Sequence, residues 1–147
     1  MREILFRGKR PDAGWIFGSL LKVTFDGTTY NLIFADNFLF VFGQATSMEH
    51  ADVIPETVGQ YTGLTDKKGV KIFEGDIVKS VFNKQSYVVR FGEYVYETDY
   101  PDEMHGFYLE NTIKKYDVSP FGCSYNWAVI IGNIHDNPEL LGGNDNA

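Results

Sequence analysis

The sequence predicts a mainly β protein, on three observations. Short runs of β-branched and aromatic residues alternate with turn residues along the chain, and aromatic residues make up 16% of it. No window sustains helical periodicity beyond about three turns. A length of 147 residues fits one ordinary domain, so we expect a single domain over residues 1–147.

Residues 1–45 are expected to form N-terminal hairpin strands. Four strand-like runs lie at residues 4–6, 14–23, 29–34 and 38–42. The strongest hairpin signal is Asp26-Gly27, because glycine accepts the positive φ that a tight primed turn demands. The next segment, "QATSMEHADVI" at 44–54, is compatible with a short helix.

Residues 53–141 are expected to form a small, bent, barrel-like antiparallel sheet. The strand-like runs are "VKIF", "DIVKSVF", "SYVVRF", "EYVYE", "GFYLE" and "WAVIIGNI". By analogy, "EGDIV" followed by "YVVRF" resembles the way SH3-like barrels begin. Asn137 as N-cap and Pro138 as first helical residue predict a short C-terminal helical turn at 138–141. Residues 142–147 are expected to form a frayed tail.

Two turn signatures come before the first barrel strands. In Asp66-Lys67-Lys68-Gly69 the aspartate accepts from a backbone amide two residues on, and the glycine takes a left-handed position. In Glu74-Gly75-Asp76 the two carboxylates flank a corner of the chain. We interpret both carboxylates as serving the backbone rather than an acid/base reaction, because neighbouring strand residues point to opposite faces.

The apolar positions of these runs predict the core. Its expected members are Ile4, Phe6, Ile16, Phe17, Leu20, Leu32, Phe34, Val58, Tyr61, Leu64, Ile72, Ile77, Val78, Val89, Phe91, Leu109, Trp127, Val129, Ile131 and Leu140.

Other groupings of reactive side chains lack the spacing of a known chemistry. Cys123 as a nucleophile would need a base from His50, His105 or His135, and nothing in the sequence pairs them. The segment 97–106 gathers oxygen and imidazole groups but lacks the ligand spacing of a calcium loop or a zinc protease; these groups are Glu97, Asp99, Asp102, Glu103 and His105. Turn bonding is the preferred interpretation of Asn133 and Asn137. The sequence therefore predicts no catalytic residue, no metal site and no cofactor.

The charge distribution makes nucleic acid a less favoured partner. The formal net charge is −7, and residues 91–139 hold nine acids against two lysines. An acidic surface repels phosphate backbones. The basic candidates for such contacts are Arg2, Arg7, Lys9 and Arg10, or Lys67, Lys68, Lys71, Lys79 and Lys84. The candidates for base stacking are Phe91, Tyr94 and Tyr96, but Tyr94 and Tyr96 stand beside acids.

A cytoplasmic setting without a membrane is expected. Cys123 is the only cysteine, so no intrachain disulfide forms. The start, "MREILFRGKR", lacks the apolar run of a signal peptide, and no uninterrupted apolar run reaches the length of a membrane helix.

Three segments resemble the signature blocks of the YopX-like family, small proteins of phages and prophages. They are "REILFR" at 2–7, "ETVGQYTGLTDKKGVKIFEGDIV" at 56–78 and "IGNIHDNPELL" at 131–141. The resemblance implies a mostly β fold, a bacterial or phage origin and a cytoplasmic setting in the host cell. It implies no activity and no site residues, because the family is uncharacterised in function.

Four functional hypotheses remain open. The first is a non-enzymatic phage accessory protein that associates with itself or with a phage or host protein, which would cover exposed strand edges. The second is a small β-barrel that binds nucleic acid. The third is an acidic decoy that occupies a host nucleic-acid-binding protein with residues 93–103. The fourth, an enzyme, has no recognisable set of catalytic residues behind it.

Overall fold

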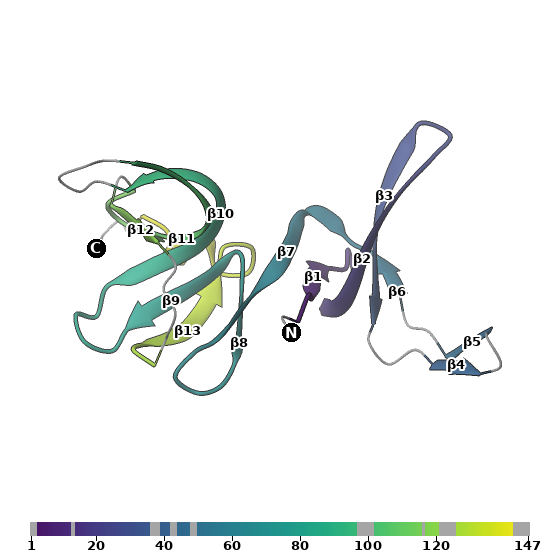
Figure 1. Ribbon diagram of the computed structural model, residues 1–147, viewed down its shortest axis with the longest axis horizontal. Coiled ribbons are helices and arrows are strands. Elements are labelled where there is room, and N and C mark those ends of the chain that lie inside the picture. Colours follow the sequence, from purple (N-terminus) through teal and green to yellow (C-terminus); the bar gives the residue numbers. More distant parts are fainter. Residues whose placement is uncertain are drawn as a thin grey trace. The chain divides into compact units, whose positions relative to one another are not determined.

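The computed structural model describes residues 3–12, 14–35, 39–41, 44–47, 50–96, 102–115, 117–120 and 126–142 (Figure 1). Within these ranges there are thirteen strands: β1 (Phe6–Lys9), β2 (Trp15–Phe25), β3 (Thr28–Ala35), β4 (Leu39–Val41), β5 (Gln44–Ser47), β6 (His50–Asp52), β7 (Ile54–Thr65), β8 (Lys71–Phe73), β9 (Asp76–Ser80), β10 (Ser86–Tyr96), β11 (Asp102–Asn111), β12 (Val118–Pro120) and β13 (Ala128–Asn133). The described residues contain no helix beyond a single 3-10 turn, η1 (Pro138–Leu140). The predicted mainly β class is therefore confirmed.

The strands form two principal antiparallel sheets. One has the order β6-β3-β2-β1-β7-β8, and the other has the order β12-β11-β10-β9-β13. The second sheet curls into a half-barrel (Figure 1), which confirms the predicted bent, barrel-like sheet. A short pair, β4-β5, stands apart from both. In the described part of the chain, no helix has the length and apolarity needed to cross a bilayer.

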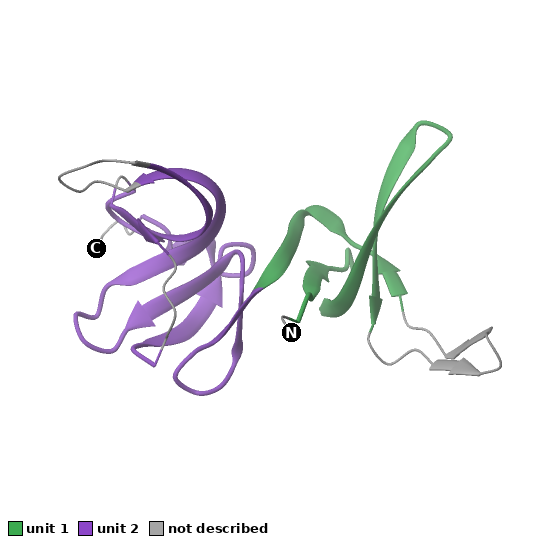
Figure 2. Cartoon of the chain, in the orientation of Figure 1, with its two compact units in different colours: residues 1–61 green, residues 62–147 purple. Residues whose placement is uncertain are grey.

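The chain forms two compact units, residues 1–61 and 62–147, and β7 runs from the first into the second (Figure 2). The boundary lies later than the expected division between residues 45 and 53. The expectation of one domain over residues 1–147 stays a prediction.

The first unit is organised around the β2–β3 hairpin. Asp26 and Gly27 have φ of 52° and 77°, and Phe25 pairs with Thr28 across them. The primed turn predicted at this dipeptide is confirmed. Its buried side chains are Ile16, Ile33, Ala35 and Val53, with Phe6, Leu20, Ala51 and Val58 packed against them.

The short helix considered for residues 44–54 is wrong. The described residues of this segment form β5, β6 and the start of β7. In β6, Ala51 lies opposite Ile33 of β3. Pairing with an existing hairpin therefore overrides the weak helical preference of this segment. Met48 and Glu49 lie outside the described residues.

The core of the second unit lies inside the curled sheet. It contains Ile72, Val78, Val89, Leu109 and Ala128. The neighbouring Ile77 and Val88 are also buried, so β9 and β10 are covered on both faces where they pair.

The predicted core is correct in part. Seven of its members are buried: Ile16, Tyr61, Ile72, Ile77, Val78, Val89 and Leu109. Nine are half-buried: Phe6, Leu20, Leu32, Phe34, Val58, Leu64, Trp127, Val129 and Leu140. Four are exposed, and for these the prediction is wrong: Ile4, Phe17, Phe91 and Ile131. On β2 and β10 both faces carry apolar residues, so alternation did not reveal which face is covered.

The end of the chain follows the prediction closely. The helical turn occupies Pro138–Leu140, but Asn137 makes no side-chain cap bond to it. Its Oδ1 instead accepts from the Asn133 nitrogen at 3.2 Å. The Gly142 nitrogen donates to the Thr112 carbonyl at 2.8 Å. Gly142, which was expected in the frayed tail, is therefore fixed by a hydrogen bond. Residues 143–147 lie outside the described residues.

Candidate functional site

The hairpin of β10 and β11 is the longest paired element of the second unit. Its register runs from Tyr87 opposite Asn111 to Tyr96 opposite Asp102. Gly92 and Gly106 face each other near the middle, with φ of 146° and 148°. Side chains other than hydrogen rarely adopt such φ values. The glycine pair therefore allows both strands to bend at the same level.

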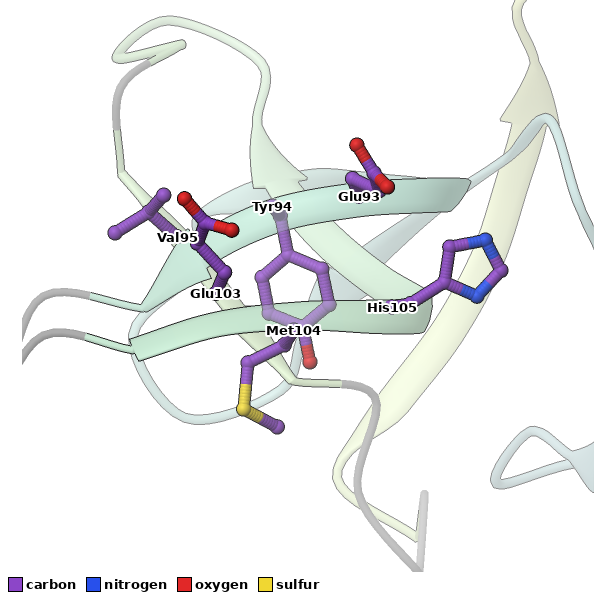
Figure 3. Close-up of a pocket in the computed structure, with 6 residues that line it drawn as sticks. All are labelled: Glu93, Tyr94, Val95, Glu103, Met104 and His105. Atoms are coloured by element: carbon purple, nitrogen blue, oxygen red, sulfur yellow. The ribbon is translucent and has the colours of Figure 1, made fainter.

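The glycine pair separates a core part of the hairpin from an exposed part. On the core side, Val89 and Leu109 are buried in the half-barrel. On the other side lies an open cavity of about 380 Å³ (Figure 3). It is lined by Glu93, Tyr94, Val95, Glu103, Met104 and His105. We call these six residues the hairpin site.

Cross-strand pairing arranges the hairpin site. Glu93 pairs with His105, Tyr94 with Met104, and Val95 with Glu103. Because side chains alternate along a strand, Tyr94 and Met104 share one face and the other four share the opposite face. Figure 3 shows Tyr94 and Met104 on one side of the ribbon, with Glu93 and Val95 on the other.

Aromatic contacts stiffen both faces. Phe91 meets Phe107 edge-on with ring centroids 4.8 Å apart, and meets His105 edge-on at 5.3 Å. On the other face, the rings of Tyr94 and Tyr108 stack at 4.6 Å. Desolvation raises the pKa of the Tyr94 hydroxyl above its ordinary value of 10.0, so this group is neutral at pH 7. The aromatic rings thus form a fixed support beside the carboxylates.

The site is strongly anionic and its carboxylates are available. Glu93 and Glu103 are exposed, and within the described residues neither carboxylate takes part in a hydrogen bond or an ion pair. By contrast, Glu110 further along β11 is paired, with 3.2 Å between its Oε1 and Arg90 Nη2. The segment 93–103 carries five acids, three tyrosines and no lysine or arginine. The arrangement can attract a cation and pair with its charge.

The family model described as YopX protein matches residues 16–142. The chain belongs to the YopX family. No curated protein matches it. Among solved structures, the crystal structure of protein EF1440 from Enterococcus faecalis is similar with a TM-score of 0.57 and 21% identity, covering 96% of this chain and 99% of that one. At that identity the similarity establishes the fold alone.

In this YopX-family chain, the carboxylate of Asp76 has a backbone role. It is 2% exposed, and its Oδ2 accepts from the Phe73 nitrogen at 2.7 Å. Gly75 between the two acids has φ of 93°, its nitrogen donates to the Val89 carbonyl, and its carbonyl accepts from Ile134. These bonds agree with the corner predicted at Glu74-Gly75-Asp76.

The other candidates for chemistry are dispersed or lie beyond the described part of the chain. Cys123, Glu97 and Asp99 are outside the described residues. His50 stacks on Phe34 with ring centroids 5.2 Å apart, and His105 belongs to the hairpin site. Across the described ranges, no three or more His, Cys, Asp or Glu side chains are grouped to hold a metal ion.

The asparagines at the end of β13 bond to the backbone, as predicted. Asn133 Oδ1 accepts from the nitrogens of His135 and Asp136 at 3.0 and 2.9 Å. Asn137 Oδ1 returns to the Asn133 nitrogen. Both side chains shape the turn that follows β13.

The two groups of basic residues that were candidates for phosphate contacts differ in solvent exposure. Arg7 is only 7% exposed, and its Cζ lies 4.6 Å from the centroid of the Trp15 ring. Its charge is therefore poorly placed for a phosphate. Arg2 lies outside the described residues. The lysines of the second group are all exposed: Lys67, Lys68, Lys71, Lys79 and Lys84.

Sequence reasoning found the hairpin site only in pieces. It named Tyr94 as a stacking candidate, Glu103 and His105 in the segment 97–106, and residues 93–103 as an acidic decoy surface, but it singled out neither Val95 nor Met104. The missing information was the register, because one residue of slip would pair Tyr94 with a different neighbour. The acid-rich segment around Pro101, flanked by two strand-like runs, was the available signal.

Proposed function

We propose that this YopX-family protein is a non-enzymatic interaction module that binds a basic segment of another protein at the hairpin site. The observation that carries the proposal is a pair of exposed carboxylates, Glu93 and Glu103, which line an open cavity on an aromatic hairpin and have no hydrogen bond or ion pair among the described residues. The proposed setting is the cytoplasm of a bacterial host, where phage and host proteins both supply basic segments.

The chemistry of the site suits lysine and arginine side chains. Carboxylates accept charge-assisted hydrogen bonds from guanidinium and ammonium groups. The exposed ring of Phe91, on the same face as the carboxylates, favours a cation placed above it. The exposed Val95 on that face offers apolar surface for the methylene stems of the same side chains.

The surrounding charge favours fast association with such a partner. Five acids without a compensating lysine or arginine lie within residues 93–103. An electrostatic field of one sign raises the association rate of a partner of opposite charge, and salt screens this field. Nucleic-acid-binding proteins carry the basic surfaces that fit this field, so they are the preferred class of partner.

The proposal is tested with a fluorescently labelled arginine-rich peptide and an uncharged peptide of equal length. We expect binding of the basic peptide alone, measured by fluorescence anisotropy. The double variant Glu93→Lys/Glu103→Lys should weaken binding by at least about tenfold. Glu56→Lys is the matched control for a single charge reversal, since Glu56 is exposed on β7.

Two results would count against the proposal. One is the absence of binding to the basic peptide by the wild-type protein at low salt. The other is a loss of binding free energy per reversed charge that is the same for Glu56→Lys and for Glu93→Lys/Glu103→Lys. That result would assign the attraction to net charge alone. Val95→Ala separates a shaped site from a charged surface, because a shaped site loses affinity without any change of charge.

Nucleic-acid binding is the second candidate, and the exposure of five lysines in residues 62–147 favours it. A gel shift with labelled single-stranded and double-stranded DNA at low salt tests it. If phosphate contacts dominate, affinity falls steeply as salt rises. Reversal of Lys67 and Lys79 should then abolish the shift, while the hairpin variant Glu93→Lys/Glu103→Lys should strengthen it.

A further inference from the structure

The β2–β3 hairpin of the first unit gathers apolar side chains on one face. The register places Ser19 opposite Phe34, Leu21 opposite Leu32, Val23 opposite Tyr30 and Phe25 opposite Thr28. Residues directly opposite each other in an antiparallel pair share a face. We call the following set the β2–β3 apolar face: Phe17, Ser19, Leu21, Val23, Phe25, Thr28, Tyr30, Leu32 and Phe34. None of these residues is charged.

Much of this face is open. Phe25 is 73% exposed, Leu21 48%, Phe17 44% and Tyr30 40%. With about 200 Å² for a fully exposed aromatic side chain, these four side chains together present about 400 Å². An apolar area of about 400 Å² is comparable to the largest patch on a typical monomer, and such patches are often functional.

The opposite face of the same hairpin has a different character. At its base it carries the buried Ile16, Ile33 and Ala35 of the first core. Toward the turn it carries polar groups, and the hydroxyls of Thr24 and Thr29 lie 2.9 Å apart in an exposed position. The polar stretch is suited to contact with water. The β2–β3 apolar face is therefore the side of the hairpin that would gain most from being covered.

The hairpin also lacks lateral support along its outer part. β1 pairs with Trp15–Gly18, and β6 pairs with Leu32–Phe34. Among the described strands, none pairs with residues 19–30 except β2 and β3 themselves, and Figure 1 shows the two strands continuing as a two-stranded ribbon. An isolated two-stranded ribbon is marginally stable in water without a further layer. This length of ribbon therefore needs a cover.

We propose that the cover is a second copy of this chain, bound through the same β2–β3 apolar face in a two-fold symmetric dimer. The β2–β3 apolar face has the low charge that such a contact requires. Each copy has a net charge of −7, which opposes self-association, so two copies can meet only on a surface with few acids. Along β2 and β3 this face carries no acid, and Asp52 of β6, opposite Leu32, lies at its edge.

The available area also fits a dimer. Two faces of about 400 Å² from four side chains each give about 800 Å², and the half-buried Val23, Leu32 and Phe34 add to it. The total is of the order of the roughly 1,000 Å² that a specific interface needs. A face-to-face stack of this kind is self-complementary, as two-fold symmetry requires.

The test is the mass of the full-length protein in solution, measured by sedimentation equilibrium. We expect a dimer for the wild type at concentrations of about 50 μM. Leu21→Glu places a charge in the middle of the face and should weaken dimerisation by at least about tenfold. Thr24→Glu adds the same charge on the opposite face of the same strand, and we expect it to remain dimeric.

Leu21 and Phe25 are exposed in the single chain, so their replacement should leave the fold intact. Circular dichroism of Leu21→Glu and Phe25→Glu checks this directly. A wild-type protein that is monomeric at about 200 μM would overturn the proposal. So would equal effects of Leu21→Glu and Thr24→Glu, because they would show that the face is not the contact.

Dimerisation and peptide binding are separable by experiment. Glu93→Lys/Glu103→Lys should lose the basic peptide and stay dimeric, whereas Leu21→Glu should become monomeric and retain the peptide. Each proposal therefore has a variant that leaves the other unaffected.

Discussion

Asp66 Oδ2 lies 3.0 Å from the backbone nitrogen of Ile130, a residue 64 positions further along the chain. The other carboxylate oxygen, Oδ1, accepts from the nitrogens of Lys68 and Val70 at 2.8 and 2.9 Å. One aspartate thus closes its own turn and fastens that turn to β13. The Lys67 nitrogen, which donates to the Ala128 carbonyl at 2.9 Å, reinforces the same connection.

Asp66→Ala is expected to destabilise the second unit by about 3 kcal/mol, because three backbone amides in partly buried hydrogen bonds would lose a charged acceptor. Chemical denaturation monitored by tryptophan fluorescence, to which Trp127 of the second unit contributes, measures the loss. Asp117→Ala, at an exposed turn position, is the matched control and should cost little. If both substitutions cost the same, the bond to Ile130 contributes nothing specific.

Gly75→Val is expected to cost about 2 kcal/mol, because Gly75 has φ of 93° and a β-branched residue resists that conformation. Gly14→Val is the control, since a Cβ built at Gly14 meets nothing within 4 Å and the position has no positive φ. Thermal melts of both variants provide the comparison. An unchanged melting temperature for Gly75→Val would contradict the strained corner.

Gly92→Ala and Gly106→Ala are each expected to cost about 1–2 kcal/mol, purely through backbone conformation. A Cβ at either position would meet no atom within 4 Å, so crowding is excluded as a cause. Both variants should also weaken basic-peptide binding, because the hairpin would bend differently. Retention of wild-type stability and affinity in both variants would show that the glycine pair does not shape the hairpin.

Stability should fall in alkali partly through Tyr94. Desolvation raises the pKa of its hydroxyl in the folded state above 10.0, so the folded protein holds this proton more tightly than the unfolded chain. The contribution is complete below pH 10 and is lost as pH rises through the folded-state pKa. Tyr94→Phe should therefore show a shallower decline in unfolding free energy above pH 10 than the wild type does. Parallel curves for the two proteins would contradict this assignment.

Several local features were predictable from the sequence. The turn at Asp26-Gly27, the turn from Asp66 to Gly69 and the corner at Gly75 each depend on residue types whose backbone preferences act over two to four positions. The confirmed φ values and hydrogen bonds at these turns follow from that short range. The same is true of the 3-10 turn that begins at Pro138.

The two proposed interaction surfaces were less predictable, because they depend on which strands pair and in which register. Phe91 was expected in the core, but it lies beyond the covered part of β10 and is 46% exposed. Phe17 was also expected in the core, but it belongs to the β2–β3 apolar face and is 44% exposed. Both strands are apolar on two faces, so only the neighbouring layer distinguishes inside from outside.

The amino-acid sequence alone determined the β class, the positions of the tight turns and the YopX relationship, because composition, periodicity and turn chemistry act locally. Only the tertiary structure decided that Asp66 would reach Ile130, that Glu93 and Glu103 would flank one cavity, and that the aromatic face of β2 and β3 would stay open. Those outcomes follow from long-range strand pairing, whose register is set by the packing of the whole sheet rather than by any segment within it.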